Sequence, residues 1–159
     1  MNVLFLCTAN SCRSILAEAI FNHLAPAGWY VLSAGSHPAG QVHPRVLALL
    51  TRTGISTEGY YSKSPDNLPA TPDIVITVCA GVAGETCPFY PGQVPCAHWD
   101  IQDPAQATGT DREIDAAFLT CYRILRAHVE AFLALPLDTL RQDKAAFKVE
   151  MDKISTLTT

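Results

Sequence analysis

The chain has 159 residues, of which 48% are hydrophobic and 16% charged, and its formal net charge is −4. This length and composition predict one globular domain with a substantial core, and the acidic balance offers no basic surface for nucleic acid or for an anionic membrane. No apolar run approaches the roughly 18 residues of a membrane-spanning helix, and the N-terminus lacks a basic leader. We therefore expect a cytoplasmic protein with no nucleic-acid or membrane partner.

The first predicted strand, residues 3–6, leads directly into a loop that starts at Cys7 and contains Arg13, and a helical apolar pattern follows over residues 14–25. In this order the backbone N–H groups of the loop converge on one point, and the positive end of the helix dipole reinforces them. A tetrahedral oxyanion fits such a cradle, Arg13 can bind two of its oxygens, and the same field favours a thiolate at Cys7. The alternative, a small buried Cys7 at a strand end, leaves the strand–loop–helix context unexplained. The loop thus predicts covalent catalysis by Cys7 on phosphate or a phosphate mimic bound by Thr8, Ala9, Asn10, Ser11, Cys12, Arg13 and Ser14.

The rest of the chain alternates strands and helices. Hydrophobic patterns predict strands at residues 29–33, 73–78 and 95–99, and helices at residues 43–53, from 110 past 132, and more weakly at 139–154. Thr110 and Glu113 form a capping-box pattern at the start of the long helix, and Pro136 ends it. This alternation predicts an α/β fold, a small four-stranded parallel sheet with helices on both faces. We divide the chain into a main part, residues 1–135, and a C-terminal helical extension of the same domain, residues 136–159.

Three candidate side chains follow predicted strands and should meet at one edge of the sheet. Cys7 follows the first strand, Cys79 the third, and Asp103 comes a few residues after the fourth. Ligands of parallel sheets bind at the carboxyl ends of the strands. Asp103 could there give a proton to a leaving oxygen, although Asp-Pro is also a common turn pair.

The six cysteines predict thiols, redox-active thiols or ligands, because a cytoplasmic chain rarely uses a disulfide scaffold. Cys79 and Cys87 flank a glycine-containing loop, so they can pair if it closes and pass a disulfide on by exchange. Two reduced packing residues are one alternative. A metal site with Cys96 and His98 is another, but the spacing does not match structural zinc, and we expect no metal. Cys121 lies on the apolar face of the long helix and is expected in the core.

The chain resembles the thioredoxin-coupled arsenate reductases, which share the fold of the low-molecular-weight tyrosine phosphatases. The resemblance extends over residues 1 to about 135. It rests on residues 7–14, Ser33-Ala34-Gly35, residues 75–79, Cys87-Pro88, His98-Trp99 and Asp103-Pro104-Ala105.

This resemblance implies a mechanism for arsenic detoxification. Cys7 attacks arsenate, Asp103 helps to expel water or hydroxide, Cys79 attacks the adduct to release arsenite, and Cys87 carries the disulfide outward. It also implies that Ser14 hydrogen-bonds Cys7, that Asn10 braces the loop and that Cys12 is no part of the redox relay. Some relatives bind potassium beside the loop through residues matching Asn10, Glu18 and Ser33 and an aspartate. Lys63 takes the aspartate's position here, so we expect no potassium requirement.

Two other functions remain open at this point. A tyrosine phosphatase would need only Cys7, Arg13 and Asp103, but such enzymes usually have an aromatic residue where this chain has Ala105. A non-catalytic redox or metal-binding module would use the thiols without turnover. For the reductase we expect a monomer that needs no cofactor, binds arsenate with phosphate or sulfate as competing oxyanions, and takes electrons from thioredoxin or another small thiol reductant.

Overall fold

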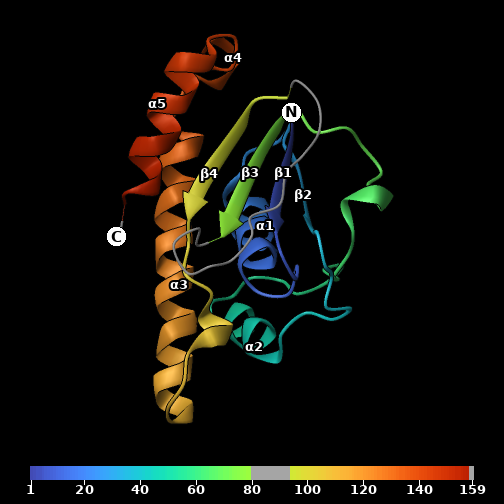
Figure 1. Cartoon of the computed structure of the whole chain (residues 1–159), viewed down its shortest axis with the longest axis vertical. Coiled ribbons are helices and arrows are strands. Elements are labelled where there is room, and N and C mark those ends of the chain that lie inside the picture. The colour runs from blue at the N-terminus through green and yellow to red at the C-terminus, as the bar shows by residue number, and fades with distance from the viewer. Residues whose placement is uncertain (80–93, 158–159) are drawn as a thin grey trace.

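The computed structural model describes residues 1–79 and 94–157, and its centre is a four-stranded parallel sheet. The strand order is β2-β1-β3-β4, and all three neighbouring pairs are parallel (Figure 1). The strands are β1 Asn2–Cys7, β2 Tyr30–Gly35, β3 Ile74–Cys79 and β4 Cys96–Asp100. The predicted α/β class with a four-stranded parallel sheet is confirmed, and each strand begins and ends within two residues of its predicted position.

The described helices follow local signals in the sequence. They are α1 Arg13–Leu24, α2 Pro44–Arg52, α3 Asp111–Leu133, α4 Leu137–Leu140 and α5 Lys144–Ser155, with short 3-10 turns η1 Pro65–Asn67 and η3 Pro104–Gln106. The predicted capping box is present: the Thr110 hydroxyl accepts from the Glu113 N–H, and the Glu113 carboxylate accepts from the Thr110 N–H.

The single helix predicted over residues 139–154 is wrong, because two helices occupy this stretch. The first, α4, ends at Leu140, and α5 begins at Lys144. The Asp143 side chain accepts a hydrogen bond from the Ala146 N–H at 3.1 Å. An aspartate that caps a helix in this way starts a new helix and does not continue the old one.

The main core lies on the sheet face that presents alternate residues of β1, among them Phe5. The Phe5 ring centroid lies 5.9 Å from that of Phe21 and 5.7 Å from that of Trp99. Buried residues of α1, α2, α3 and α5 join this cluster. On the opposite face Leu4, Leu6, Ala34 and Val75 form a smaller cluster. The partly buried side chains of Leu32, Leu68 and Val94 pack against it.

The C-terminal extension is built into the main core. Phe147, Met151 and Ile154 of α5 are at most 4% exposed and belong to the same cluster as Phe5 and Trp99. Figure 1 shows α5 beside β4 and α3. Among the helices described, none has the length and apolar character needed to cross a bilayer.

Candidate active site

The loop between β1 and α1 is held from outside by the chain that follows β2. Backbone N–H groups of residues 36–43 donate to four carbonyls of the loop, in the pairs Ser36–Cys7 (3.2 Å), His37–Thr8 (2.8 Å), Ala39–Ala9 (2.9 Å) and His43–Ser11 (3.0 Å). In a planar trans peptide the N–H points opposite to the carbonyl. Carbonyls that are bonded outward therefore turn the next N–H groups inward, which is the arrangement that an anion-binding loop requires.

Asn10 shows the inward direction of these N–H groups. Its N–H donates to Cys7 Sγ at 3.2 Å, and its φ of 49° is a left-handed conformation that asparagine tolerates better than most residues. Its side chain is fully buried and has partners at both ends. The amide oxygen accepts from the Lys63 N–H at 2.9 Å, which leaves the amide nitrogen to donate to Ser14 Oγ at 2.7 Å and Ser33 Oγ at 3.0 Å.

These bonds allow Ser14 to donate to Cys7. Ser14 Oγ lies 2.8 Å from Cys7 Sγ. Because Ser14 Oγ already accepts from the Asn10 amide, its own proton is available to donate to sulfur. The Cys7 sulfur thus has a hydroxyl and a backbone N–H within hydrogen-bond distance. The structure thus places Cys7, Asn10 and Ser14 as the resemblance implied.

Arg13 and Asp103 meet at the rim of the loop. Arg13 begins α1 and is 4% exposed. Its Nη1 donates to the Ile101 carbonyl at 3.1 Å, and its Nη2 lies 3.6 Å from Asp103 Oδ2. The guanidinium is therefore held in place at the end of β4, and the helix dipole of α1 adds positive potential at the same point.

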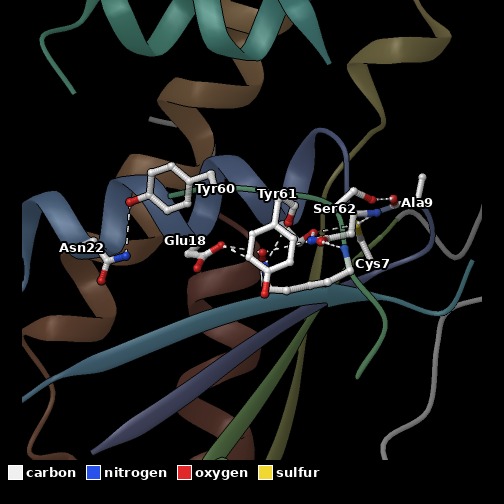
Figure 2. A network of polar contacts seen from close by, with 11 residues as sticks. Cys7, Ala9, Glu18, Asn22, Tyr60, Tyr61 and Ser62 are labelled. Carbon is white, nitrogen blue, oxygen red and sulfur yellow. Dashed lines mark hydrogen bonds and ion pairs between the residues drawn. The ribbon is translucent and has the colours of Figure 1, made fainter. Parts of the chain in front are cut away.

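A second layer of buried charge lies behind the loop. Ser33 Oγ donates to Glu18 Oε1 at 2.6 Å, and Lys63 Nζ lies 3.8 Å from the same oxygen. Burial raises the pKa of Glu18 and lowers that of Lys63, and in each case the partner's charge opposes the shift. Lys63 Nζ also donates to the Tyr61 carbonyl at 3.1 Å and lies 4.6 Å from the Tyr61 ring centroid. Figure 2 shows this network between Glu18 and Cys7.

Cys79 ends β3, the strand next to β1, so it reaches the same edge of the sheet as Cys7. It is buried and disulfide-bonded. Its carbonyl accepts from the Ile101 N–H at 3.3 Å, which connects it to the turn that carries Asp103. Cys87, the other predicted relay cysteine, lies outside the described residues.

The other cysteines of the described chain are free thiols. Burial raises the pKa of both Cys12 and Cys121 to about 12, so these thiols stay protonated near neutral pH. Cys96 is exposed on β4. Across residues 1–79 and 94–157, no group of three His, Cys, Asp or Glu side chains is arranged to hold a metal ion.

Sequence reasoning missed the contacts that hold the site from outside. Ser62 is one example: its hydroxyl donates to the Ala9 carbonyl at 3.1 Å and accepts from the Gly40 N–H at 3.2 Å. The Ile101 carbonyl that anchors Arg13 is another. Backbone groups are present at every position, so these contacts leave no signal in the sequence.

The chain was compared with known proteins. The family model described as "Low molecular weight phosphotyrosine protein phosphatase" matches residues 2–146. An arsenate reductase of Shouchella clausii is 38% identical over 112 residues, which cover 70% of this chain and 79% of the relative. The crystal structure of an arsenate reductase from Archaeoglobus fulgidus matches with a TM-score of 0.65 and 28% identity, over 80% of this chain and 98% of the other. A thioredoxin-dependent arsenate reductase of Corynebacterium glutamicum matches with a TM-score of 0.53 and 30% identity. This match covers 81% of this chain and 61% of the other.

Proposed function

This chain belongs to the low molecular weight phosphotyrosine protein phosphatase family, and curated relatives from Shouchella clausii and Bacillus subtilis are arsenate reductases. We therefore propose that it reduces arsenate to arsenite through Cys7, Cys79 and Cys87. One observation carries the proposal: two cysteines end adjacent strands at the same edge of the sheet. Hydrolysis of a phosphate ester needs only the loop, Arg13 and Asp103. Reduction of arsenate, in contrast, uses a second thiol that can form a disulfide with the first.

The first step forms the bond between Cys7 and arsenic. Arsenate binds in the loop with two oxygens on the Arg13 guanidinium. The Cys7 thiolate, which accepts from Ser14 Oγ, attacks arsenic. One arsenate oxygen leaves as water with a proton from the Asp103 carboxyl, which lies 3.6 Å from Arg13.

The second step is the reduction. The Cys79 thiolate attacks Cys7 Sγ, the sulfur–arsenic bond breaks, and its electron pair stays on arsenic, so arsenic(V) becomes arsenic(III) and leaves as arsenite. Two thiols have become the Cys7–Cys79 disulfide, which balances the two electrons gained by arsenic. Cys87 then attacks Cys79, frees Cys7 and leaves a Cys79–Cys87 disulfide for an external dithiol to reduce. Cys12 and Cys121 take no part, because thiols with a pKa of about 12 are poor nucleophiles at neutral pH.

The experiment that tests the relay compares Cys79→Ser and Cys87→Ser, with Cys96→Ser as the matched control at an exposed free cysteine. Both relay variants should stop multiple-turnover arsenate reduction and keep hydrolysis of a small aryl phosphate. With Cys87→Ser, one arsenite should form per enzyme and a Cys7–Cys79 disulfide should accumulate, as read by mass spectrometry. With Cys79→Ser, little arsenite should be released.

Two results would contradict this proposal. If both relay variants keep full turnover with thioredoxin, the resolving thiol comes from outside the chain. If the wild-type protein hydrolyses aryl phosphates but produces no arsenite with any dithiol donor, the chain is a phosphatase, the second candidate function, which the loop with Arg13 and Asp103 would suffice to support.

Thioredoxin is the proposed electron donor. The support is that a structural relative, the reductase of Corynebacterium glutamicum, is described as thioredoxin-dependent. NADPH oxidation coupled to arsenate, with thioredoxin, glutaredoxin and glutathione supplied in turn, tests the choice of donor. We expect turnover with thioredoxin and its reductase, and turnover only with glutathione and glutaredoxin would refute this part.

A further inference from the structure

The turn that carries Asp103 lies over a cavity. Residues 101–110 connect β4 to α3, and a space of about 430 Å³ lies between the first part of this connection and that helix. Ile101, Asp103 and Pro104 line it from the turn, and Thr120 and Cys121 line it from α3. Interiors are otherwise close-packed. Ile101 and Pro104 are buried, but the Asp103 side chain is 24% exposed at this space, so its position depends on the hydrogen bonds that anchor its turn.

Two hydrogen bonds anchor the turn on its inner side, toward β3 and α1. The Ile101 N–H donates to the Cys79 carbonyl at 3.3 Å, and the Ile101 carbonyl accepts from Arg13 Nη1 at 3.1 Å. The outer side has a different anchor. Because β4 is the edge strand of the sheet, the outward N–H of Asp100 meets no further strand, and it donates to Ser155 Oγ at 3.0 Å. Ser155 is the last residue of α5.

The end of α5 is itself held in place at two levels. Phe147, Met151 and Ile154 bury its apolar face in the core. Beyond its end, the Leu157 carbonyl accepts from His128 Nε2 of α3 at 2.9 Å, and the ring of this histidine packs edge-on against Trp99 of β4, with centroids 5.1 Å apart. Figure 1 shows α5 running beside β4. Ser155 is therefore a fixed acceptor.

We propose that the C-terminal segment 144–157 positions the proton donor of the active site. Ser155 holds the backbone of Asp100, the last residue of β4, and the turn that begins there places the Asp103 carboxyl beside Arg13. Ser155 touches no reacting atom and is a positioning residue. The inference rests on the proposed role of Asp103 as proton donor, and it gives the C-terminal extension a function in the reaction.

A double-mutant cycle tests this inference. Ser155→Ala removes the acceptor, Ser155→Thr keeps the hydroxyl, and a chain that ends at residue 154 removes both C-terminal anchors but keeps the three core side chains. Each change is made in the wild type and in Asp103→Asn, and the single-turnover rate of arsenite release is measured. In the wild type, Ser155→Ala should slow the step about fivefold, as expected for one lost hydrogen bond. The shortened chain should slow it more, and Ser155→Thr should restore it.

In the Asp103→Asn background the same changes should have almost no further effect, because the inference limits the role of Ser155 to placing the Asp103 carboxyl, which is already gone. Equal losses in both backgrounds would show a general structural role and overturn the inference, as would wild-type rates for Ser155→Ala and the shortened chain. Melting temperatures identify variants that fail to fold.

The cycle can also be run on phenyl phosphate, which separates this inference from the proposed function. A wild type that hydrolyses phenyl phosphate but releases no arsenite refutes the reductase and leaves the cycle measurable. A wild type that turns over neither substrate refutes both.

Discussion

Gly35 offers a sharp test of how the oxyanion loop is supported. This residue ends β2 opposite Cys7, and it approaches the loop so closely that a side chain has no room. A Cβ built on Gly35 would lie 2.6 Å from the Thr8 carbonyl oxygen, 2.8 Å from the Asn10 backbone nitrogen and 2.9 Å from Asn10 Cβ. All three atoms belong to the loop, so Gly35→Ala must push the loop away from β2.

The size of the effect follows from these distances. The Thr8 carbonyl must move by about 0.8 Å to reach an ordinary contact of 3.4 Å. Overpacking of this kind typically costs about 1–3 kcal/mol of stability, and for a chain of this length each kcal/mol lowers Tm by roughly 2–4 °C. Misplacement of reacting groups by about 1 Å can cost roughly a hundredfold in rate. We therefore expect kcat/KM for arsenate to fall by about two orders of magnitude, with weaker binding of inorganic phosphate.

Gly54→Ala is the matched control. Gly54 has a left-handed φ of +77° and no atom within 4 Å of its built Cβ, and it follows the end of α2. Alanine there should cost about 1–2 kcal/mol through backbone strain, with kcat/KM unchanged. Steady-state kinetics, phosphate titration and thermal melts of both variants decide the question. If Gly35→Ala keeps kcat/KM within twofold of the wild type, the geometry derived for the loop is wrong.

Other predictions concern the nucleophile and the buried charges. Cys7→Ser should abolish both arsenate reduction and aryl phosphate hydrolysis. Arg13→Lys should lose most of both activities, because the point charge of lysine cannot replace the planar guanidinium that binds two oxygens. Near-normal kinetics of either variant would contradict the assigned roles. The Lys63 ammonium, 3.8 Å from Glu18, should take the place of a bound cation. Exchanging potassium for a large organic cation at fixed ionic strength should therefore change neither activity nor Tm. A gain in Tm specific to potassium would refute this. Burial lowers the pKa of His128 below 6.5, and Nδ1 has no hydrogen-bond partner in the described part of the chain. The unfolded chain then binds the proton more readily than the folded one, so the free energy of unfolding should be constant above about pH 7 and should fall as the pH drops below 6.5. Urea titrations at pH 7.5 and 5.5 measure this, and His128→Gln should lose most of the dependence if the assignment is correct.

The catalytic loop could be predicted from the sequence because its parts are contiguous. The apolar strand, Cys7, Arg13 and the start of the helix follow one another within a few residues, and each has a local physical meaning. The same holds for the capping box at Thr110 and for the strands of the parallel sheet. Each strand can be recognised from its own apolar run, without knowing which strands pair with it.

The prediction failed where a local signal was weak. The apolar spacing over residues 139–154 suggested one helix, but Asp143 caps a new one. Side-chain spacing could not reveal this break, since the same apolar residues suit a continuous helix and two short ones.

By itself, the sequence predicted Cys7 as the nucleophile and residues 7–14 as its loop, and it determined the order of strands and helices, because these depend on neighbours along the chain. Only the tertiary structure decided how the loop is held in shape. The N–H groups of residues 36–43, the Ile101 carbonyl beneath Arg13 and the Ser155 hydroxyl on Asp100 come from distant segments. Most of these contacts use backbone groups. Every residue carries these groups, so the pattern of side chains in the sequence does not predict which of them will form hydrogen bonds in the fold.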